Sequence, residues 1–288
     1  MKANRCLFYD FTIAPPKSVS VVGLTQDNRI LKLHEQAVRH AMTELEKLAA
    51  TRIRKSGQKG DRVTGNLVTA TFRHETSREL DPHLHTHCVV FNATFDQVEN
   101  RWKALETSGM YRAHQYATNL YRHELSKGLR ALGYRIENHA RGFEIKGVPQ
   151  SVIERFSKRH QQIDEETRAR LAKGEKVGNV KDLRERVAHG NRRRKMKNST
   201  AEALRSTWSK EMQPEEVAAL KSLWAVRPLH LAQKADLAEI VAWAEQHIFE
   251  RRAVVPEHEL MAAALERGRG EDFDLGALLQ AFGERGLL

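Results

Sequence analysis

The fold of this chain depends on residues 73–87, which read RHETSRELDPHLHTH and hold four of its fourteen histidines. Residues 66–73, just before this stretch, are mostly β-branched and aromatic, which predicts a strand. A similar composition predicts a second strand over residues 86–95. Asp81-Pro82 between them is a turn signal, so we expect two neighbouring strands joined by a polar connection.

Three histidines of this stretch are predicted to converge. Side chains of a strand alternate between its faces, so His85 and His87 share a face. His74 continues the apolar face of the preceding strand. If the strands pair with their apolar faces toward one core, the three imidazoles meet at one end of it and form a metal site. His83 has the same parity but lies nearest the turn, so we treat it as a spare rather than a ligand.

The chemistry of these side chains supports a metal site. Neutral imidazole is the commonest metal ligand in proteins. A histidine set without cysteine leaves coordination positions open, which is typical of Lewis-acid catalysis rather than of a closed structural site. The alternative is a solvent-facing polar loop that happens to be rich in histidine.

An acidic residue on the first predicted strand could support this site. Residues 7–13 read as a buried strand on which Asp10 shares a face with Phe8 and Thr12. A carboxylate on an apolar strand is costly without a partner, and metal-bound histidines commonly donate their second N–H to one. We therefore predict that Asp10 orients one of the histidines. The alternative is that it caps a loop near the strand end.

The sequence PPKSVS at residues 15–20 predicts the start of a short helix whose N–H groups, together with Lys17, face phosphate. The β-branched Val19, Val21 and Val22 argue for a strand instead, and we favour the helix. Long helices are predicted over residues 30–53, 108–132 and 149–172, a hairpin over residues 134–145, and a basic loop over residues 54–62.

Composition and charge describe a globular protein with a polyanionic partner. The chain has 288 residues, no apolar run as long as a membrane span and no signal-peptide core. Its two cysteines fit a reducing cytoplasm. Residues 199–288 carry 10 Lys and Arg against 15 Asp and Glu, a net charge of −5. Since the whole chain carries +11, residues 1–198 carry +16. This asymmetry indicates nucleic acid as the partner of the first part.

Two further features concern the DNA surface and the domain boundary. Arg101-Trp102-Lys103 places an aromatic ring between two cations, which suits stacking and phosphate contacts on single-stranded nucleic acid; Trp102 as a core residue is the alternative. A capping box at residues 199–202 follows the basic run at 192–195. We place a boundary near residue 198, with a metal- and DNA-binding domain over 1–198 and a small all-helical, linker-like module over 199–288.

Several of these segments resemble one known family. Residues 8–20 (FYDFTIAPPKSVS) resemble the second conserved segment of TrwC/TraI-type (MobF) conjugative relaxases. Residues 65–68, 72–78 and 81–87 resemble the third. The resemblance covers roughly residues 5–200 and places the chain with the HUH single-strand endonucleases.

The resemblance implies an α+β fold with a central antiparallel sheet covered by helices. It implies that His74, His85 and His87 bind a divalent ion and that Asp10 orients one of them. In the family the ion grips the scissile phosphate of the transfer-origin strand, and a tyrosine attacks to leave a 5′-phosphotyrosine. Mg or Mn is expected from the resemblance, whereas three imidazoles favour Zn, Co or Ni.

The expected partner is single-stranded DNA at a transfer origin, with other conjugation proteins possible and a monomeric chain. The residues expected to bind the DNA are Lys17, Arg73, Arg78, Arg101, Trp102 and Lys103.

One departure from the family concerns the nucleophile. The family's catalytic tyrosines precede the strand that carries Asp10, and here that strand begins within the first ten residues. Tyr9 has the wrong parity, the other four tyrosines match no catalytic motif, and no Walker A motif of a helicase occurs. We therefore expect a relaxase core without its nucleophile, either truncated or with its start assigned too late. The alternatives are a non-catalytic single-stranded DNA-binding module and a metallohydrolase that uses water.

Overall fold

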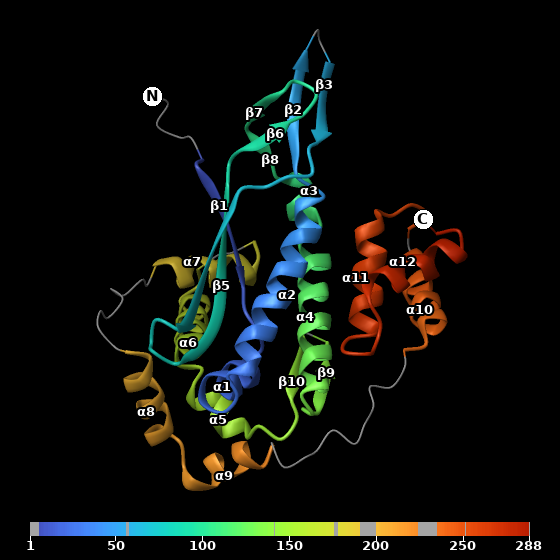
Figure 1. Cartoon of the computed structure of the whole chain (residues 1–288). Coiled ribbons are helices and arrows are strands. Elements are labelled where there is room, and N and C mark those ends of the chain that lie inside the picture. The colour runs from blue at the N-terminus through green and yellow to red at the C-terminus, as the bar shows by residue number, and fades with distance from the viewer. Residues whose placement is uncertain are drawn as a thin grey trace.

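The computed structural model describes residues 6–55, 58–140, 142–175, 178–190, 200–223, 235–250 and 252–287. Antiparallel sheets and helices make up this part of the chain, which confirms the predicted α+β class (Figure 1). The boundary predicted near residue 198 and the basic run at 192–195 lie outside the described residues.

A three-stranded antiparallel sheet carries the histidines. Its order is β1-β5-β4, so β5 pairs with both neighbours. Both histidine-bearing strands extend further toward the turn than predicted, since β4 continues to Thr76 and the alternating pattern of β5 already begins at Pro82. The connection between the two strands is therefore only residues 77–81. The strands are β1 (Phe8–Ile13), β4 (Thr69–Thr76) and β5 (Pro82–Phe91).

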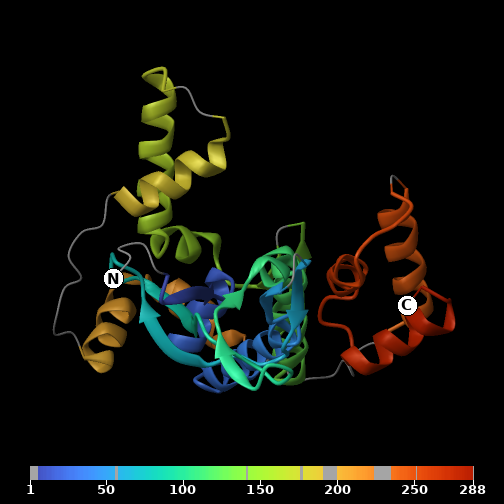
Figure 2. The ribbon, with the colours of Figure 1, turned by 90° about the horizontal axis from the view of Figure 1, so that it is seen from above.

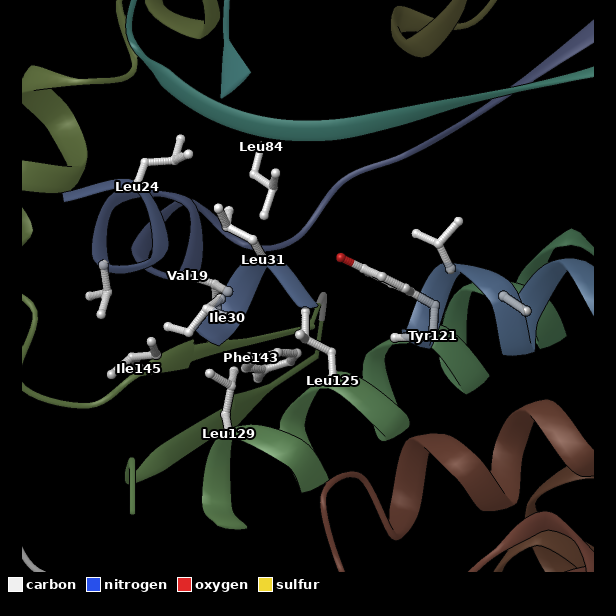
Figure 3. Packing of buried hydrophobic residues seen from close by; sticks show 14 of the residues in the cluster. Val19, Leu24, Ile30, Leu31, Leu84, Tyr121, Leu125, Leu129, Phe143 and Ile145 are labelled. Atoms are coloured by element: carbon white, nitrogen blue, oxygen red, sulfur yellow. The ribbon is translucent and has the colours of Figure 1, made fainter. Parts of the chain in front are cut away.

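The core lies on the face of this sheet that is opposite to the histidines. Leu84, Cys88 and Val90 of β5 are buried there, and Figure 3 shows Leu84 among leucines of the helices beneath the strand. On the histidine face, Phe72 is 54% exposed and Phe91 is 45% exposed. The expectation that the apolar faces bearing the histidines point into one core is therefore wrong, because the helices of the core cover the other face and leave this one open to ligands.

The first of the helices that cover this sheet is α1, and it confirms the helix predicted at the PPKSVS sequence. Val19, Val21 and Val22 do not make a strand there, because the core encloses them on a short buried helix. α2 and α4 pack side by side (Figure 1). The predicted long helices are shorter, since residue 50 begins a strand and a break at Ala113 separates α3 from α4. The helices are α1 (Lys17–Thr25), α2 (Arg29–Glu46), α3 (Ser108–Arg112) and α4 (His114–Ala131).

Short strands form three further sheets. The loop expectation for residues 54–62 is wrong for its described part, because residues 54–55 and 58–62 belong to the paired strands β2 and β3. With β8 and the β6–β7 ribbon, these strands lie at the end of the molecule reached by β5 (Figure 1). The hairpin predicted at 134–145 is β9–β10. The strands are β2 (Ala50–Lys55), β3 (Gln58–Val63), β6 (Thr94–Asp96), β7 (Arg101–Lys103), β8 (Leu105–Glu106), β9 (Ile136–His139) and β10 (Gly142–Ile145).

Five helices lie around the start of β5 or project from it. The helix predicted over 149–172 is interrupted at Phe156 and Ser157, and α6 and α7 project together from the body (Figure 2). α8 and α9 pack through Trp208, Met212 and Leu220 on the core that also buries Leu84, Cys88 and Val90, which we call the first core. These helices are α5 (Gln150–Arg155), α6 (Lys158–Ala172), α7 (Val180–Gly190), α8 (Ala201–Glu211) and α9 (Pro214–Ser222).

The last three helices build a second core with Tyr116 and Leu120 of α4. Asn119 and His123 of the same helix hydrogen-bond to backbone carbonyls of this unit. In the described residues, no helix combines the length and apolar composition needed to cross a bilayer. The helices are α10 (Leu237–Phe249), α11 (Glu257–Arg267) and α12 (Leu275–Glu284).

Candidate metal centre and nucleic-acid interface

Three histidine rings from two adjacent strands form a nearly regular triangle. The register places His74 opposite His85 and Phe72 opposite His87. The ring centroids are 5.3 Å apart for His74 and His85, 5.4 Å for His74 and His87, and 5.2 Å for His85 and His87. Imidazoles that bind one ion through bonds of about 2.1 Å have ring centres roughly 5 Å apart at tetrahedral angles. The spacing of these three rings therefore fits a single cation.

The rings are spaced for a single ion, but their present orientations do not point three nitrogen atoms at one position. Within the described part of the chain, no three His, Cys, Asp or Glu side chains already have a ligating arrangement. The rings of His74 and His85 are nearly parallel, at 26°. Ligation of one ion would need rotation of side chains on a backbone that already has the required spacing. Such rotation is easy, because a half-exposed ring turns far more readily than a paired strand moves.

Hydrogen bonds set the tautomers of two of these rings. His87 Nδ1 lies 2.7 Å from Asp10 Oδ2 and 3.0 Å from Thr12 Oγ1, both on β1. His85 Nδ1 lies 2.9 Å from the carbonyl oxygen of His83. Since a carbonyl only accepts, Nδ1 of neutral His85 carries the proton and Nε2 carries the lone pair that can bind a cation. The Asp10 carboxylate favours the same tautomer in His87.

His83 extends the histidine row toward the turn. Its ring stacks on His85 with 4.7 Å between centroids. Burial lowers the pKa of His83 to about 3, and the nearby Lys17 charge and any proton taken up by His85 act in the same direction. The ring is therefore neutral at physiological pH. Its place beside His85 at the turn end of the row is consistent with the role of a spare.

The histidines line a pocket of about 790 Å³ that α5 and α6 close on the opposite side. Arg78 and Lys17 contribute positive charge to its lining. Sequence reasoning did not predict the opposite wall, because nothing local in its residues relates them to the histidines. That wall consists of Ile153, Phe156, Ser157, Arg159, His160 and Ile163.

α1 holds the start of β5 and brings Lys17 into this pocket. Lys17 Nζ donates to the carbonyl oxygen of Pro82 at 3.0 Å, and the backbone N–H of Leu84 donates to Ser20 Oγ at 3.2 Å. Burial lowers the pKa of Lys17 to about 8, although Asp81 and Glu144 oppose this shift. The N–H of Ser18, predicted to face phosphate, instead donates to Glu144 Oε2 at 3.0 Å.

The predicted DNA-binding residues of the histidine stretch separate onto two faces. Arg78 is exposed in the β4–β5 turn and lines the pocket. Arg73 lies on the other face of β4, where its guanidinium pairs with Glu35 of α2. Strand alternation causes this separation, because Arg73 is one residue away from His74. The two arginines therefore cannot act at the same surface.

The Arg101-Trp102-Lys103 segment forms β7, away from the pocket. Trp102 is 59% exposed and packs edge-on against Phe95 at 5.5 Å, so its alternative interpretation as a core residue is wrong. Arg101 is exposed and pairs with Glu99 at 2.5 Å. The Lys103 side chain is 13% exposed and bonds to Glu99 at 2.9 Å and Asp96 at 3.3 Å. Lys103 therefore stabilises the β6–β7 ribbon, which weakens its assignment to DNA.

Comparisons with known proteins agree with this arrangement. Residues 1–214 match the family model described as TrwC relaxase. The multifunctional conjugation protein TraI of Escherichia coli (strain K12) is 42% identical over 170 residues, which cover 54% of this chain and 9% of that protein. The chain thus spans less than a tenth of this curated relative.

Solved structures of conjugative relaxase TrwC are also similar. A copper-bound form in complex with OriT DNA has a TM-score of 0.64 and 33% sequence identity, and the match covers 79% of this chain and 75% of that one. TrwC complexed with a 27-mer DNA comprising the recognition hairpin and the cleavage site has a TM-score of 0.63 and 32% identity, over 77% and 75% of the two chains. By its sequence and its fold, the chain belongs to the TrwC relaxase family.

Proposed function

We propose that this chain is the metal- and DNA-binding part of a conjugative relaxase, which holds single-stranded transfer-origin DNA at His74, His85 and His87. The observation that carries this proposal is the triangle of ring centroids at 5.2 to 5.4 Å beside a pocket of about 790 Å³. A divalent ion bound there would neutralise charge on the phosphate under attack. The known relaxase TrwC, described as copper-bound and in complex with OriT DNA, supports this proposal.

The residues of this chain have distinct roles in the proposal. Asp10 holds the His87 proton on Nδ1 and so keeps Nε2 available as a ligand. Arg78 and Lys17 provide positive charge for the DNA backbone within the pocket. Ile153, Phe156 and Ile163 place apolar surface on the opposite side of the pocket, which lowers the local dielectric constant and so strengthens charge interactions with a bound phosphate.

The identity of the ion is part of the proposal. Three imidazoles favour Zn, Co or Ni by affinity, whereas Mg or Mn follows from the family resemblance and from their availability. Calorimetric titration of the apo chain with each of these ions would rank them. The free thiols of Cys6 and Cys88 support a reducing compartment, so we include the cytoplasm in the proposal.

The positions of the tyrosines favour a second candidate function, DNA binding without cleavage. All five tyrosines lie in the described part of the chain, and none lines the pocket. Three of them donate to or share hydrogen bonds with other groups: Tyr116 with Glu44, Tyr121 with His34, and Tyr134 with Asp27. Burial raises the pKa of each of these three phenols, which makes them poorer nucleophiles.

A single incubation separates these functions. The chain is mixed with Mn²⁺ and a fluorescein-labelled single-stranded oligonucleotide that carries the transfer origin, and the products are resolved on a denaturing gel. A covalent protein–DNA adduct supports strand transfer, and an anisotropy change without any adduct supports the binding module. Cleaved DNA without an adduct would indicate a hydrolase. Absence of both metal and DNA binding would refute the proposal.

A further inference from the structure

The turn between the two histidine strands has a constrained backbone. Ser77 Oγ accepts hydrogen bonds from the N–H groups of Glu79 and Asp81 at 3.2 and 3.1 Å. The Ser77 N–H donates to the Asp81 carbonyl at 2.9 Å. Leu80 has a φ of 60°, a left-handed conformation that a branched apolar residue rarely adopts. Such a conformation persists only where its surroundings determine it.

This turn determines which residues of β4 and β5 face each other. His74 pairs with His85, but Thr76 pairs with Pro82, so the register shifts between these two positions. A shift of one residue in strand pairing moves side chains to the opposite face. The position of His74 relative to His85 and His87 therefore depends on the conformation of residues 77–81.

α8, more than a hundred residues further along the chain, holds this turn. Trp208 is 2% exposed, and its Nε1 donates to the Leu80 carbonyl oxygen at 2.7 Å. Arg205, one turn earlier in α8, lies 3.8 Å from Glu75 of β4. α8 therefore contacts both the turn and the strand that carries His74, and Figure 1 shows it beside the end of that hairpin.

The first residue of α6 links the same turn to α8. The Lys158 N–H donates to Asp81 Oδ2 at 3.0 Å. Its ammonium lies 3.4 Å from Asp81 Oδ1 and 2.8 Å from Glu211 Oε2, at the end of α8. The turn is thus held through a carbonyl by Trp208 and through a carboxylate by Lys158.

We propose that Trp208 is a positioning residue of the histidine site, and that its hydrogen bond to Leu80 keeps His74 in register with His85 and His87. The inference rests on the proposed function, because it assigns a role in assembling the metal site. It also makes α8 part of that site rather than of a linker.

The test compares Trp208→Phe with Trp102→Phe in the full chain. Phe at position 208 keeps most of the buried ring but removes the N–H donor, whereas Trp102 is exposed and lies away from the turn. Mn²⁺ and Co²⁺ affinities are measured by calorimetry, and amide hydrogen exchange reports on Glu79 and Asp81. We expect Trp208→Phe to weaken metal binding by about 10-fold, the lower end of the range for groups that orient metal ligands, and to speed exchange at these amides. Trp102→Phe should change neither.

Metal affinity of Trp208→Phe within twofold of the wild type, with unchanged exchange in the turn, would overturn the inference and leave the proposed function intact. A wild-type chain that binds neither ion would overturn the inference together with the metal-binding part of the proposed function, whereas single-stranded DNA binding is tested separately. If Trp208→Phe fails to fold, 3-benzothienylalanine at position 208 keeps the shape of the indole without its N–H, and the same loss of affinity is expected.

Discussion

At the residue scale, Asp10 and Thr12 orient His87 from the neighbouring strand. Thr12 is the cross-strand partner of His87, and Asp10 precedes it by one alternation on the same face. Thr12 Oγ1 also lies 3.4 Å from Asp10 Oδ1, which links the two β1 side chains. A carboxylate that accepts from Nδ1 increases the basicity of the opposite nitrogen. Removal of a ligand and removal of this support should therefore have effects of different size.

His85→Ala should lower divalent-metal affinity by more than about 100-fold, because it removes one of three ligands, whereas loss of an outer partner typically costs 10- to 100-fold. Single-stranded DNA binding in EDTA should persist, since phosphate contacts dominate that affinity. Calorimetry and anisotropy measure the two effects. His114→Ala, an exposed histidine outside the pocket, is the control. Unchanged metal affinity of His85→Ala would refute the ligand set.

Asp10→Asn should weaken metal binding by about 10-fold, which is less than the loss for His85→Ala, because the amide keeps a hydrogen bond to His87 without the negative charge. The same titrations measure this difference. A loss larger than that of His85→Ala would mean that Asp10, and not His85, contacts the ion directly.

At the scale of elements, a buried histidine connects three of them behind the histidine triangle of the proposed metal site. His34 of α2 lies 2.8 Å from Thr86 Oγ1 of β5 and 2.8 Å from the Tyr121 hydroxyl of α4. Thr86 stands between His85 and His87 and points to the opposite face. The bond to His34 therefore holds β5 against the helices while the two histidines on either side face the pocket.

The stability of the chain should depend on pH through His34. Burial lowers the pKa of His34 to about 4, with the Arg73 charge and any proton taken up by His85 acting in the same direction. The unfolded chain takes up this proton near pH 6.5, so the stabilisation is present above about pH 6.5 and is lost as the pH falls toward 4. His34→Gln should reduce the pH dependence of the unfolding free energy by about 1.4 kcal/mol per pH unit in this window.

Urea denaturation of the wild type and of His34→Gln between these pH values measures this effect. His40→Gln, on the exposed side of α2, is the matched control. Identical pH profiles for His34→Gln and the wild type would contradict the neutral, buried state of His34.

At the scale of the whole molecule, the positive side chains of the pocket come from the β4–β5 turn, from α1 and from α6. Arg78 lines the pocket, whereas Arg73 on the opposite face pairs with Glu35. Figure 2 shows the α6–α7 pair and the C-terminal helices at opposite ends of the molecule. The pocket lies at the α6 end, so we expect DNA to be held there, and the acidic C-terminal helices to lie away from it.

Arg78→Ala should lower the slope of log affinity against log salt for single-stranded DNA by about 0.7, which corresponds to the loss of one phosphate contact. Arg73→Ala removes the same charge from the opposite face and should leave the slope close to that of the wild type. Anisotropy titrations at several salt concentrations measure both slopes. Equal reductions for the two variants would show that net charge, rather than the pocket, determines binding.

Strand periodicity, a local property, was sufficient to predict part of the site. It put His85 and His87 on one face and Asp10 on the same face as Thr12, because alternation depends only on neighbouring residues. The resemblance of the motifs added the family, which the comparisons confirm. The domain boundary near residue 198 stays a prediction, although α8 and α9 pack with the first core.

Tertiary structure decided which face of the sheet is open and what surrounds the histidines. The helices α1 and α2 cover the face of Leu84 and Cys88, and no local pattern could show that the histidine face remains open. The pocket wall from α5 and α6 and the bond from Trp208 to Leu80 join segments far apart in the chain. Such contacts depend on how whole elements pack, and the periodicity of a single strand contains no information about its distant partners.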